Sequence, residues 1–314
     1  MTPNMTGNAA LSASRSADPV SADVLADPHL RSLAAEPVII RGGRDPAVPF
    51  IFASPHSGRL YPSSFAESSR LDSISLRRSE DAFVDELFDS VPDLGAPLIA
   101  ARFPRAFVDA NRAPGELDPA MFDAPLVSVS PRSPRVAAGL GVIPRVVRDG
   151  LEIYRARLPA GEAAFRLEHF YRPYHAALAE LVERTRAKFG VAIVIDCHSM
   201  PPPSKGHDIV LGDCYGEAAA PELIGNTQKI LTGLGFSVAR NTPYAGGYTT
   251  HLYGRPRDGV HALQIEVSRA LYLDEGRMEK SAGFVACRDR LRLFASKLLS
   301  EAGSWLKAAR RTAL

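Results

Sequence analysis

Short apolar runs alternate with longer helical stretches along most of the chain, and this pattern constrains the fold more than any other feature. The clearest run, residues 191–195, predicts a buried central strand. Further strands are predicted over residues 50–54, 97–101, 106–109, 207–212, 236–240 and 261–267, and helices over residues 76–90, 159–188, 221–234 and 279–307. Such alternation is typical of an α/β protein whose sheet is covered by helices.

The chain divides into a tail and one domain. Residues 1–35 are rich in Ala, Ser, Asp and Pro without periodicity, which predicts a flexible tail with a short helix near residues 22–35. No linker or internal repeat divides residues 36–314, so we expect a single domain there. Residues 111–144 are rich in Pro, Gly and Ser, and a loop of that length is typical of an active-site cover.

Composition excludes several classes of protein. The net charge of +2 comes from 37 basic and 35 acidic residues, which leaves no electrostatic footprint for nucleic acid. No apolar run reaches the 18 residues of a membrane span, and the N-terminus lacks the pattern of a signal peptide. Three widely spaced cysteines form no disulfide framework, so we expect a cytoplasmic protein. The oligomeric state stays open.

Two histidines follow apolar runs that are predicted to be strands. His56 lies in Ser-Pro-His-Ser-Gly and His198 in Asp-Cys-His-Ser, and ligands bind at the carboxyl ends of strands in open α/β sheets. A catalytic zinc ion takes about three protein ligands and keeps one position open for water. Glu80 or Asp81 can supply the third, although an acidic pair also suits the start of a helix. Asp196 can orient a histidine ligand.

Glu266 lies in an otherwise apolar predicted strand. A buried, unpaired carboxylate is costly, which suggests a function such as the general base that a catalytic zinc site needs. The alternative is an edge strand on which Gln264 and Glu266 face water.

Arginines bracket the strand predicted over residues 106–109. Guanidinium groups match carboxylates in bidentate pairs, so this cluster suits a substrate carboxylate; solvated surface arginines are the alternative. The cluster consists of Arg102, Arg105, Asn111 and Arg112. A glycine-hinged polar stretch over residues 246–256 is typical of a closing loop or of plain turns.

These motifs together resemble the N-formylglutamate amidohydrolase family. The matching pieces, in the family order, are Ser54-Pro-His-Ser-Gly, Glu80-Asp, Val108-Asp-Ala-Asn-Arg, Asp196-Cys-His-Ser, Gly247-Tyr-Thr-Thr and Gln264-Ile-Glu-Val. The resemblance implies a three-layer α/β/α fold with a central mixed sheet, of the phosphorylase/hydrolase-like class that includes zinc carboxypeptidases and aspartoacylase.

Carried over residue by residue, the resemblance implies one zinc ion per chain, on His56, Asp81 and His198. It implies Glu266 as the general base. It implies four residues that bind the substrate: Arg105, Asn111, Arg112 and Thr249. The sequence departs from the carboxypeptidase His-x-x-Glu pair, because Arg59 stands three residues after His56.

The implied reaction is hydrolysis of N-formyl-L-glutamate, a small N-acyl amino acid, to formate and L-glutamate late in histidine degradation. Glu266 activates the attacking water, and zinc and a nearby arginine stabilise the oxyanion. The alternatives are a related N-acyl amino-acid amidohydrolase, a carboxypeptidase-like peptidase, or an inactive binding protein on the same scaffold.

Overall fold

A computed structural model describes residues 27–126, 129, 133–147, 150–202 and 206–301. Within these ranges, one seven-stranded sheet runs in the order β1-β3-β2-β4-β7-β5-β6. Its strands are β1 (Val38–Arg41), β2 (Phe50–Ser54), β3 (Leu98–Ala101), β4 (Ala192–Met200), β5 (Ile209–Gly212), β6 (Val238–Arg240) and β7 (Val260–Ser268). A separate pair consists of β8 (Leu273–Asp274) and β9 (Glu279–Lys280).

The sheet is mixed. Strands β3, β2, β4 and β7 are mutually parallel, whereas β1 pairs antiparallel with β3 and β5 pairs antiparallel with β7. Strands β4 and β7 lie at the centre, and all nine residues of each are buried. Burial on both faces explains the continuous apolar runs by which the sequence revealed these strands.

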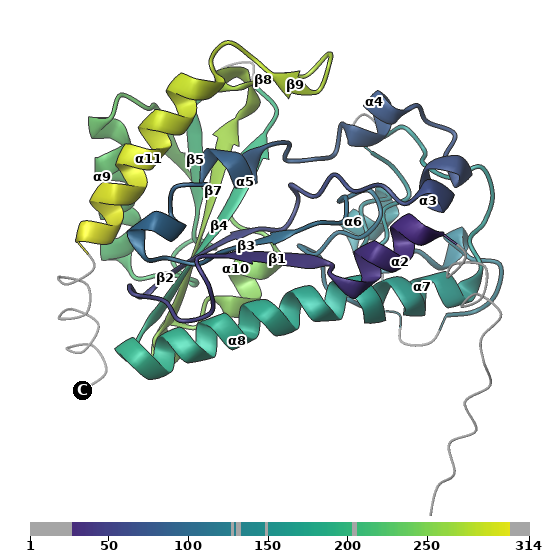
Figure 1. Ribbon diagram of the computed structural model, residues 1–314, viewed down its shortest axis with the longest axis horizontal. Helices are drawn as coiled ribbons and strands as arrows, with labels where there is room; N and C mark the ends of the chain where they lie inside the picture. Colours follow the sequence, from purple (N-terminus) through teal and green to yellow (C-terminus); the bar gives the residue numbers. More distant parts are fainter. Residues whose placement is uncertain (1–26, 127–128, 130–132, 148–149, 203–205, 302–314) are drawn as a thin grey trace, which may run out of the picture.

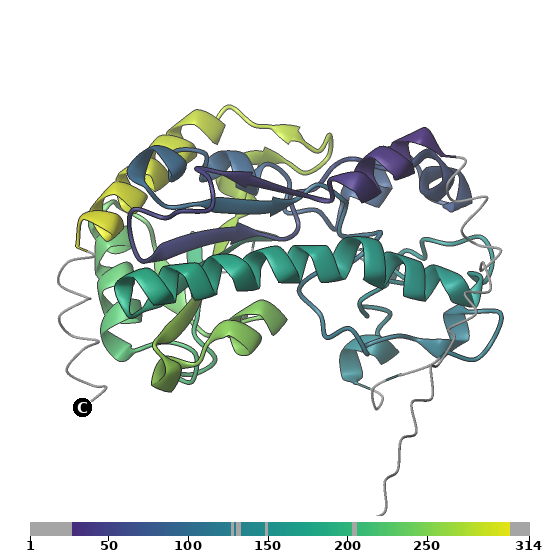
Figure 2. The same ribbon diagram turned by 60° about the horizontal axis from the view of Figure 1, so that its bottom comes forward.

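Helices cover both faces of the sheet (Figures 1 and 2). Successive side chains of a strand point to opposite faces, so Phe50 and Phe52 of β2 pack in one core and Ile51 and Ala53 in the other. Helices α5 (Val84–Leu87), α9 (Pro221–Gly233) and α11 (Phe284–Ser300) pack in the first core, and α8 (Arg172–Phe189) and α10 (Tyr248–Tyr253) in the second. The predicted three-layer fold with a mixed sheet is confirmed.

The remaining helices lie at one end of the molecule, beyond the sheet (Figure 1). They are α2 (Pro28–Ala35), α3 (Ser63–Ser68), α4 (Ser73–Arg77), α6 (Pro134–Ala137) and α7 (Ala160–Arg166). Helix α2 belongs to the segment predicted as a tail with a short helix, and its Leu30 and Leu33 are buried against the domain. Residues 1–26 of that predicted tail lie outside the described residues.

Two predicted elements are wrong. The helix over residues 76–90 is instead α4, a turn and α5, because Asp81 N–H donates to the carbonyl of His56 and Phe83 takes a left-handed conformation with φ 62°. The strand over residues 106–109 is a turn, in which the carbonyl of Pro104 accepts from Phe107 N–H and Val108 N–H.

The other predicted helices and strands form with shifted ends. The helix over 159–188 begins as α7, passes through the π-helical turn Leu167–Tyr171 and continues as α8. Part of the glycine-hinged stretch over residues 246–256 forms α10. The last helix was predicted over residues 279–307. In the structure this range begins with β9, the helix α11 follows, and residues 302–307 lie outside the described part. Among the described helices, none is long and apolar enough to cross a membrane.

Candidate active site

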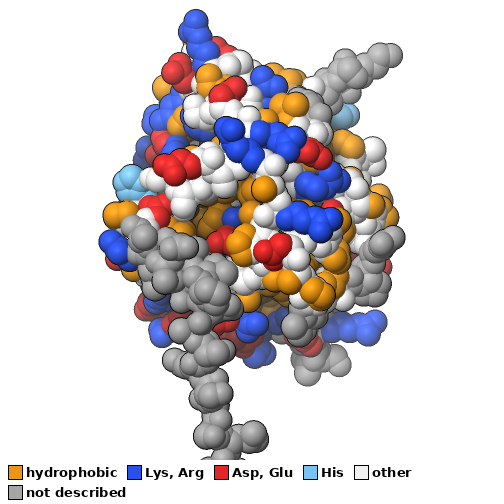
Figure 3. Space-filling model, turned by 90° about the vertical axis from the view of Figure 1, so that its right-hand side faces the viewer, with side chains coloured by type: hydrophobic (Ala, Val, Ile, Leu, Met, Phe, Trp, Pro, Cys, Tyr) orange, Lys and Arg blue, Asp and Glu red, His pale blue; other side chains and the backbone are white. Residues whose placement is uncertain are grey.

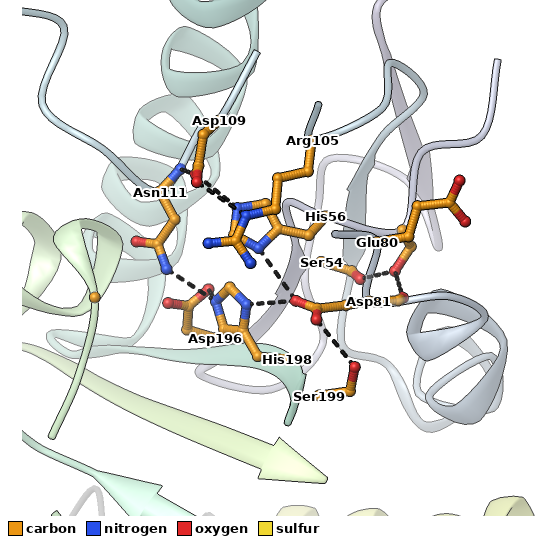
Figure 4. A network of polar contacts seen from close by, with 12 residues as sticks. Ser54, His56, Glu80, Asp81, Arg105, Asp109, Asn111, Asp196, His198 and Ser199 are labelled. Carbon is orange, nitrogen blue, oxygen red and sulfur yellow. Dashed lines mark hydrogen bonds and ion pairs between the residues drawn. The ribbon is translucent and has the colours of Figure 1, made fainter. Parts of the chain in front are cut away.

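The two histidines of the predicted site meet where β2 and β4 end (Figure 4). His56 stands in the turn after β2, as predicted. His198 lies inside β4, which runs on to Met200, so the prediction that it follows the strand is wrong. The ring centroids are 4.9 Å apart and both side chains are buried. The strand continues through His198 because β7 pairs with it along its whole length.

Asp81, rather than Glu80, faces the two histidines. Its Oδ2 lies 3.1 Å from Nδ1 of His56 and 2.9 Å from Nδ1 of His198. Glu80 points away and accepts hydrogen bonds from Tyr61 and Arg77. We call His56, Asp81 and His198 the His–Asp–His cluster; one ligand atom from each lies within 4.8 Å of the others.

The outer nitrogen of each imidazole is held by another carboxylate. Nε2 of His56 lies 2.7 Å from Oδ1 of Asp109, and Nε2 of His198 lies 3.0 Å from Oδ1 of Asp196. At His56, a proton on Nε2 leaves the lone pair on Nδ1, which faces Asp81. The Asp196 contact is an ion pair without hydrogen-bond alignment, so that buried oxygen has no hydrogen-bond partner in the described structure.

The donor set fits a metal ion. Two imidazole nitrogens and one carboxylate oxygen are what a catalytic zinc site takes from a protein. The carboxylates behind the imidazoles are the partners that orient such ligands. The described residues of this cluster can therefore hold a divalent metal.

The second oxygen of Asp81 is fixed by groups that the sequence did not single out. Oδ1 accepts from Ser199 Oγ at 2.9 Å and lies 3.3 Å from Nη2 of Arg269. Nε of Arg269 also donates to Ser199 Oγ. Arg269 is buried, and the only sequence signal for it is a charged residue directly after a buried strand. Because Ser199 and Arg269 hold Oδ1 of Asp81, its Oδ2 faces the histidines.

Asn111 holds His198 from the opposite side. Its Oδ1 accepts from the backbone N–H of Thr249 at 2.7 Å, which directs Nδ2 to Nε2 of His198 at 3.1 Å. Both ends of the amide are therefore engaged within the protein. Thr249 is fully buried and does not line the pocket; its described contact with the site runs through its backbone. Substrate contacts of both residues stay predictions.

Glu266 lies beside His198, in register on the neighbouring strand β7. Its Oε1 accepts from Nε2 of Gln264 at 2.7 Å. The amide oxygen of Gln264 accepts from Gly247 N–H at 2.6 Å, so the amide orientation is fixed. Both side chains are buried in the centre of the sheet, which rules out the edge-strand alternative.

Burial and charge shift the acidities of the site. Burial raises the pKa of Glu266 to about 7, with the charge of His198 opposing the rise. Burial also raises the pKa of Asp81, but hydrogen bonds from His198 and His56 outweigh it and lower the pKa well below its usual value. Burial lowers the pKa of His198, but Asp196 and Asp81 raise it well above the usual value. Surroundings that stabilise a proton here also stabilise a metal cation.

Arg105 and Arg112 belong to the same site. Nε of Arg105 donates to Oδ2 of Asp109 at 2.9 Å. Burial raises the pKa of Asp109, but Arg105 and His56 lower it well below its usual value. Arg112 donates to the backbone carbonyls of Leu140 and Asn111. Both arginines line the pocket, unlike Arg102, which pairs with Glu36 elsewhere.

The cluster opens into a pocket of 550 Å³. The three cluster residues and Glu266 line it together with the arginines, and Leu140, Pro144 and Val146 come from the loop predicted to cover an active site or from its end. Residues 243–247, which precede α10, line it as well. Residues 127–128 and 130–132 of the loop lie outside the described structure.

The fold and the site define a class: an α/β protein with a buried cluster that can hold a metal, next to a buried carboxylate, at the ends of its central strands. A family model described as N-formylglutamate amidohydrolase matches residues 48–273, which include the whole cluster and Glu266. The chain belongs to the N-formylglutamate amidohydrolase family.

Relatives support this membership. N-formylglutamate deformylase of Pseudomonas aeruginosa is 32% identical over 73% of this chain and 83% of its own, and that of Pseudomonas putida is 30% identical over the same shares. The crystal structure of N-formylglutamate amidohydrolase from Ralstonia eutropha JMP134 is 34% identical, with a TM-score of 0.79 over 88% of this chain and 99% of that one. An Agrobacterium tumefaciens gene product at 18% identity and TM-score 0.62, over 86% of this chain and 96% of that one, shares the fold.

Proposed function

We propose that this protein is a zinc-dependent amidohydrolase that cleaves N-formyl-L-glutamate to formate and L-glutamate, late in histidine degradation. The observation that carries the proposal is the buried His–Asp–His cluster with Glu266 beside it in an arginine-lined pocket. The names of the curated relatives, N-formylglutamate deformylase, support the substrate.

Nδ1 of His56, Oδ2 of Asp81 and Nδ1 of His198 would hold one zinc ion per chain. When bound, zinc supplies Lewis acidity for the attacked carbonyl and lowers the pKa of water. Asp109 and Asp196 hold the outer imidazole nitrogens, and Arg269 with Ser199 holds the far oxygen of Asp81.

Glu266 is the general base. It takes a proton from the water that attacks the formyl carbon and returns it to the amide nitrogen, so that the C–N bond breaks and the amine leaves neutral. Gln264 holds Oε1 of Glu266, which fixes the carboxylate for this exchange. Two observations support this role of Glu266: its side chain is buried, and it lies beside His198 on the neighbouring strand.

Arg112 and Arg105 are the main substrate-binding residues. Arg112, next to the Asn111 that contacts His198, binds the α-carboxylate close to the reacting amide. Arg105, fixed by Asp109, places positive charge near the oxygen that becomes negative during attack. Asn111, which lines the pocket, completes the substrate-binding set, and Thr249 supports it by donating its backbone N–H to Asn111.

A cytoplasmic location is part of the proposal. All three cysteines are free thiols, and burial raises the pKa of each above its usual value, so they stay protonated and unreactive. This is the pattern of a protein in a reducing compartment.

The proposal is tested by release of the amine from a panel of N-formyl, N-acetyl, N-succinyl and N-carbamoyl amino acids and short peptides, with zinc-loaded protein. We expect N-formyl-L-glutamate to have the highest kcat/KM. A preference for another acyl group or for peptides supports the amidohydrolase and peptidase alternatives. No turnover of any compound by zinc-loaded protein supports an inactive binding protein.

A further inference from the structure

Positive charge exceeds negative charge in the pocket. Among the described lining residues, five arginines face three carboxylates: Arg78, Arg105, Arg112, Arg135 and Arg269 against Asp81, Asp109 and Glu266. A bound divalent metal increases this excess. An arginine-rich, partly buried pocket of this kind suits a substrate with more than one negative charge.

Two of the five guanidinium groups are committed to carboxylates inside the protein. Arg105 pairs with Asp109, and Arg269 pairs with Asp81 and Glu275. Arg78 also interacts with neighbouring groups. These residues shape the site, and their charges are already compensated in part.

Arg112 and Arg135 are different. Arg112 reaches Asp109 only at 3.9 Å, and Arg135 makes no ion pair or hydrogen bond within the described part of the chain. Burial lowers the pKa of Arg112, and the charges of Arg105 and Arg135 lower it further against the opposing charge of Asp109. Two like charges thus line the same pocket and repel each other, and a bound anion relieves this repulsion.

Arg135 is held at this position by an ordered segment. It lies in α6, whose first turn is capped by Ser133, and Ser133 Oγ also donates to Glu116 at 2.9 Å. Val136 is buried beneath it, and the carbonyl of Leu140 accepts from Nε of Arg112. Lys and Arg side chains gather on this side of the molecule (Figure 3). The fold therefore fixes the backbone of Arg135 at the pocket that Arg112 also lines.

We propose that Arg135 binds a second carboxylate of the substrate, the one on its side chain, while Arg112 binds the α-carboxylate. The inference rests on the proposed function and deepens it: it names the residue that recognises the side-chain carboxylate of the substrate. The α-carboxylate is attached next to the reacting amide and stays near Arg112, whereas the side chain extends outward to the exposed Arg135.

The test compares N-formyl-L-glutamate with N-formyl-L-glutamine, which has the same shape and lacks the second charge. We expect wild type to favour the glutamate compound by roughly 10- to 100-fold in kcat/KM, the size of a charged hydrogen-bond pair. Arg135→Gln should abolish this preference by raising KM for N-formyl-L-glutamate. The kcat/KM for N-formyl-L-glutamine should stay nearly unchanged. Arg135→Lys should keep part of the preference.

Arg257→Gln, which removes an exposed positive charge that does not line the pocket, is the matched control and should keep the full preference. If Arg135→Gln retains it too, or if wild type hydrolyses both compounds equally, the inference is overturned while the proposed function stands. If wild type hydrolyses neither compound, the proposed function fails and the inference fails with it.

Discussion

At the level of single residues, the site is organised around one oxygen atom. Oδ2 of Asp81 faces Nδ1 of both histidines, while Oδ1 is held by Ser199 and Arg269. The carboxylate therefore offers one oxygen to a metal, in a fixed direction. A longer or neutral side chain at this position would lose either the direction or the charge.

Glu266 and His198 can be separated by experiment. Glu266→Gln keeps the shape but accepts no proton, so we expect kcat to fall ~10²- to 10⁴-fold, the usual range for a lost general base, with zinc content unchanged. His198→Ala removes a ligand and should lose zinc and activity together. Metal content and turnover are measured on the same samples. Loss of zinc from Glu266→Gln would make Glu266 a ligand.

The buried carboxyl of Glu266 predicts a pH dependence of stability in the metal-free protein. Its pKa is raised from 4.5 to about 7, so the folded state binds the proton more tightly than the unfolded state does. This contribution to stability is complete below pH 4.5 and is lost as the pH rises through about 7. Wild type should therefore lose stability relative to Glu266→Gln between these values.

Urea unfolding of both metal-free proteins at about pH 5 and about pH 8, on either side of the raised pKa, checks this difference. The Glu266→Gln variant carries no charge on this side chain at either pH. Its change in the free energy of unfolding therefore comes from the other titrating groups. Equal changes in the free energy of unfolding for the two proteins would contradict the raised pKa.

The sequence indicated the cluster and Glu266 and missed several residues that fix them in place. His56, His198 and Glu266 stood out because their types are rare in or next to apolar strands, whereas Asp81 was chosen over Glu80 only through the family resemblance. Arg269 did not, since it acts through contacts with residues far away in the sequence, and the contact of Asp109 with His56 was not foreseen for the same reason. Only the fold brings such partners together.

At the level of elements, β4 and β7 carry the site within the strands themselves. Asp196 and His198 of β4, and Gln264 and Glu266 of β7, follow the period of two that places side chains on one face. The apolar halves of both strands were predicted correctly. The predicted strand ended at residue 195, because the polar residues that follow are typical of a loop. In the structure, pairing with β7 continues β4 through these residues.

The turn between α4 and α5 shows a similar limit. Phe83, Leu87 and Phe88 have helical spacing, which predicted one helix; Leu87 and Phe88 are buried, and Phe83 is partly buried against the same core. Two short helices place the same residues in the core and leave a turn that brings Asp81 to His56. A periodic apolar pattern does not distinguish the two arrangements.

The start of α10 is coupled to the site, which a glycine substitution can test. A Cβ at Gly247 would lie 2.2 Å from Nδ2 of Asn111, so Gly247→Ala must push the amide away from His198 and Thr249. We expect kcat/KM to fall on the order of 10²-fold, the usual effect of displacing an active-site group by a small distance. The free energy of unfolding should change little.

Gly225→Ala is the matched control. Gly225 lies inside α9, and its nearest described neighbour, Nη2 of Arg240, is 4.0 Å from the added Cβ. This variant should keep full activity and gain about 0.5–1 kcal/mol in helix stability. Full activity of Gly247→Ala would mean that Asn111 needs no fixed position.

At the level of the whole molecule, the site joins segments from along the chain. The cluster links the turn after β2, the turn before α5 and the end of β4. Only the folded chain brings these three together, so a metal bound there stabilises the folded state.

Metal removal should therefore lower Tm without unfolding the protein. At free zinc 100-fold above Kd, the stabilisation is about 2.7 kcal/mol, and a chelator removes it. Thermal unfolding with chelator, and after zinc is restored, measures the shift. His198→Ala should show no shift with either treatment. An unchanged Tm of wild type on chelation would place no metal in this cluster.

The central claim is that a zinc ion lies between His56, Asp81 and His198 in the active enzyme. An anomalous difference map at the zinc edge, from crystals of protein that releases formate from N-formyl-L-glutamate, tests it most directly. The account predicts one peak per chain, ~2.0–2.2 Å from Nδ1 of each histidine and from Oδ2 of Asp81. A map from active protein with no peak there, or with its peak at other residues, would contradict it.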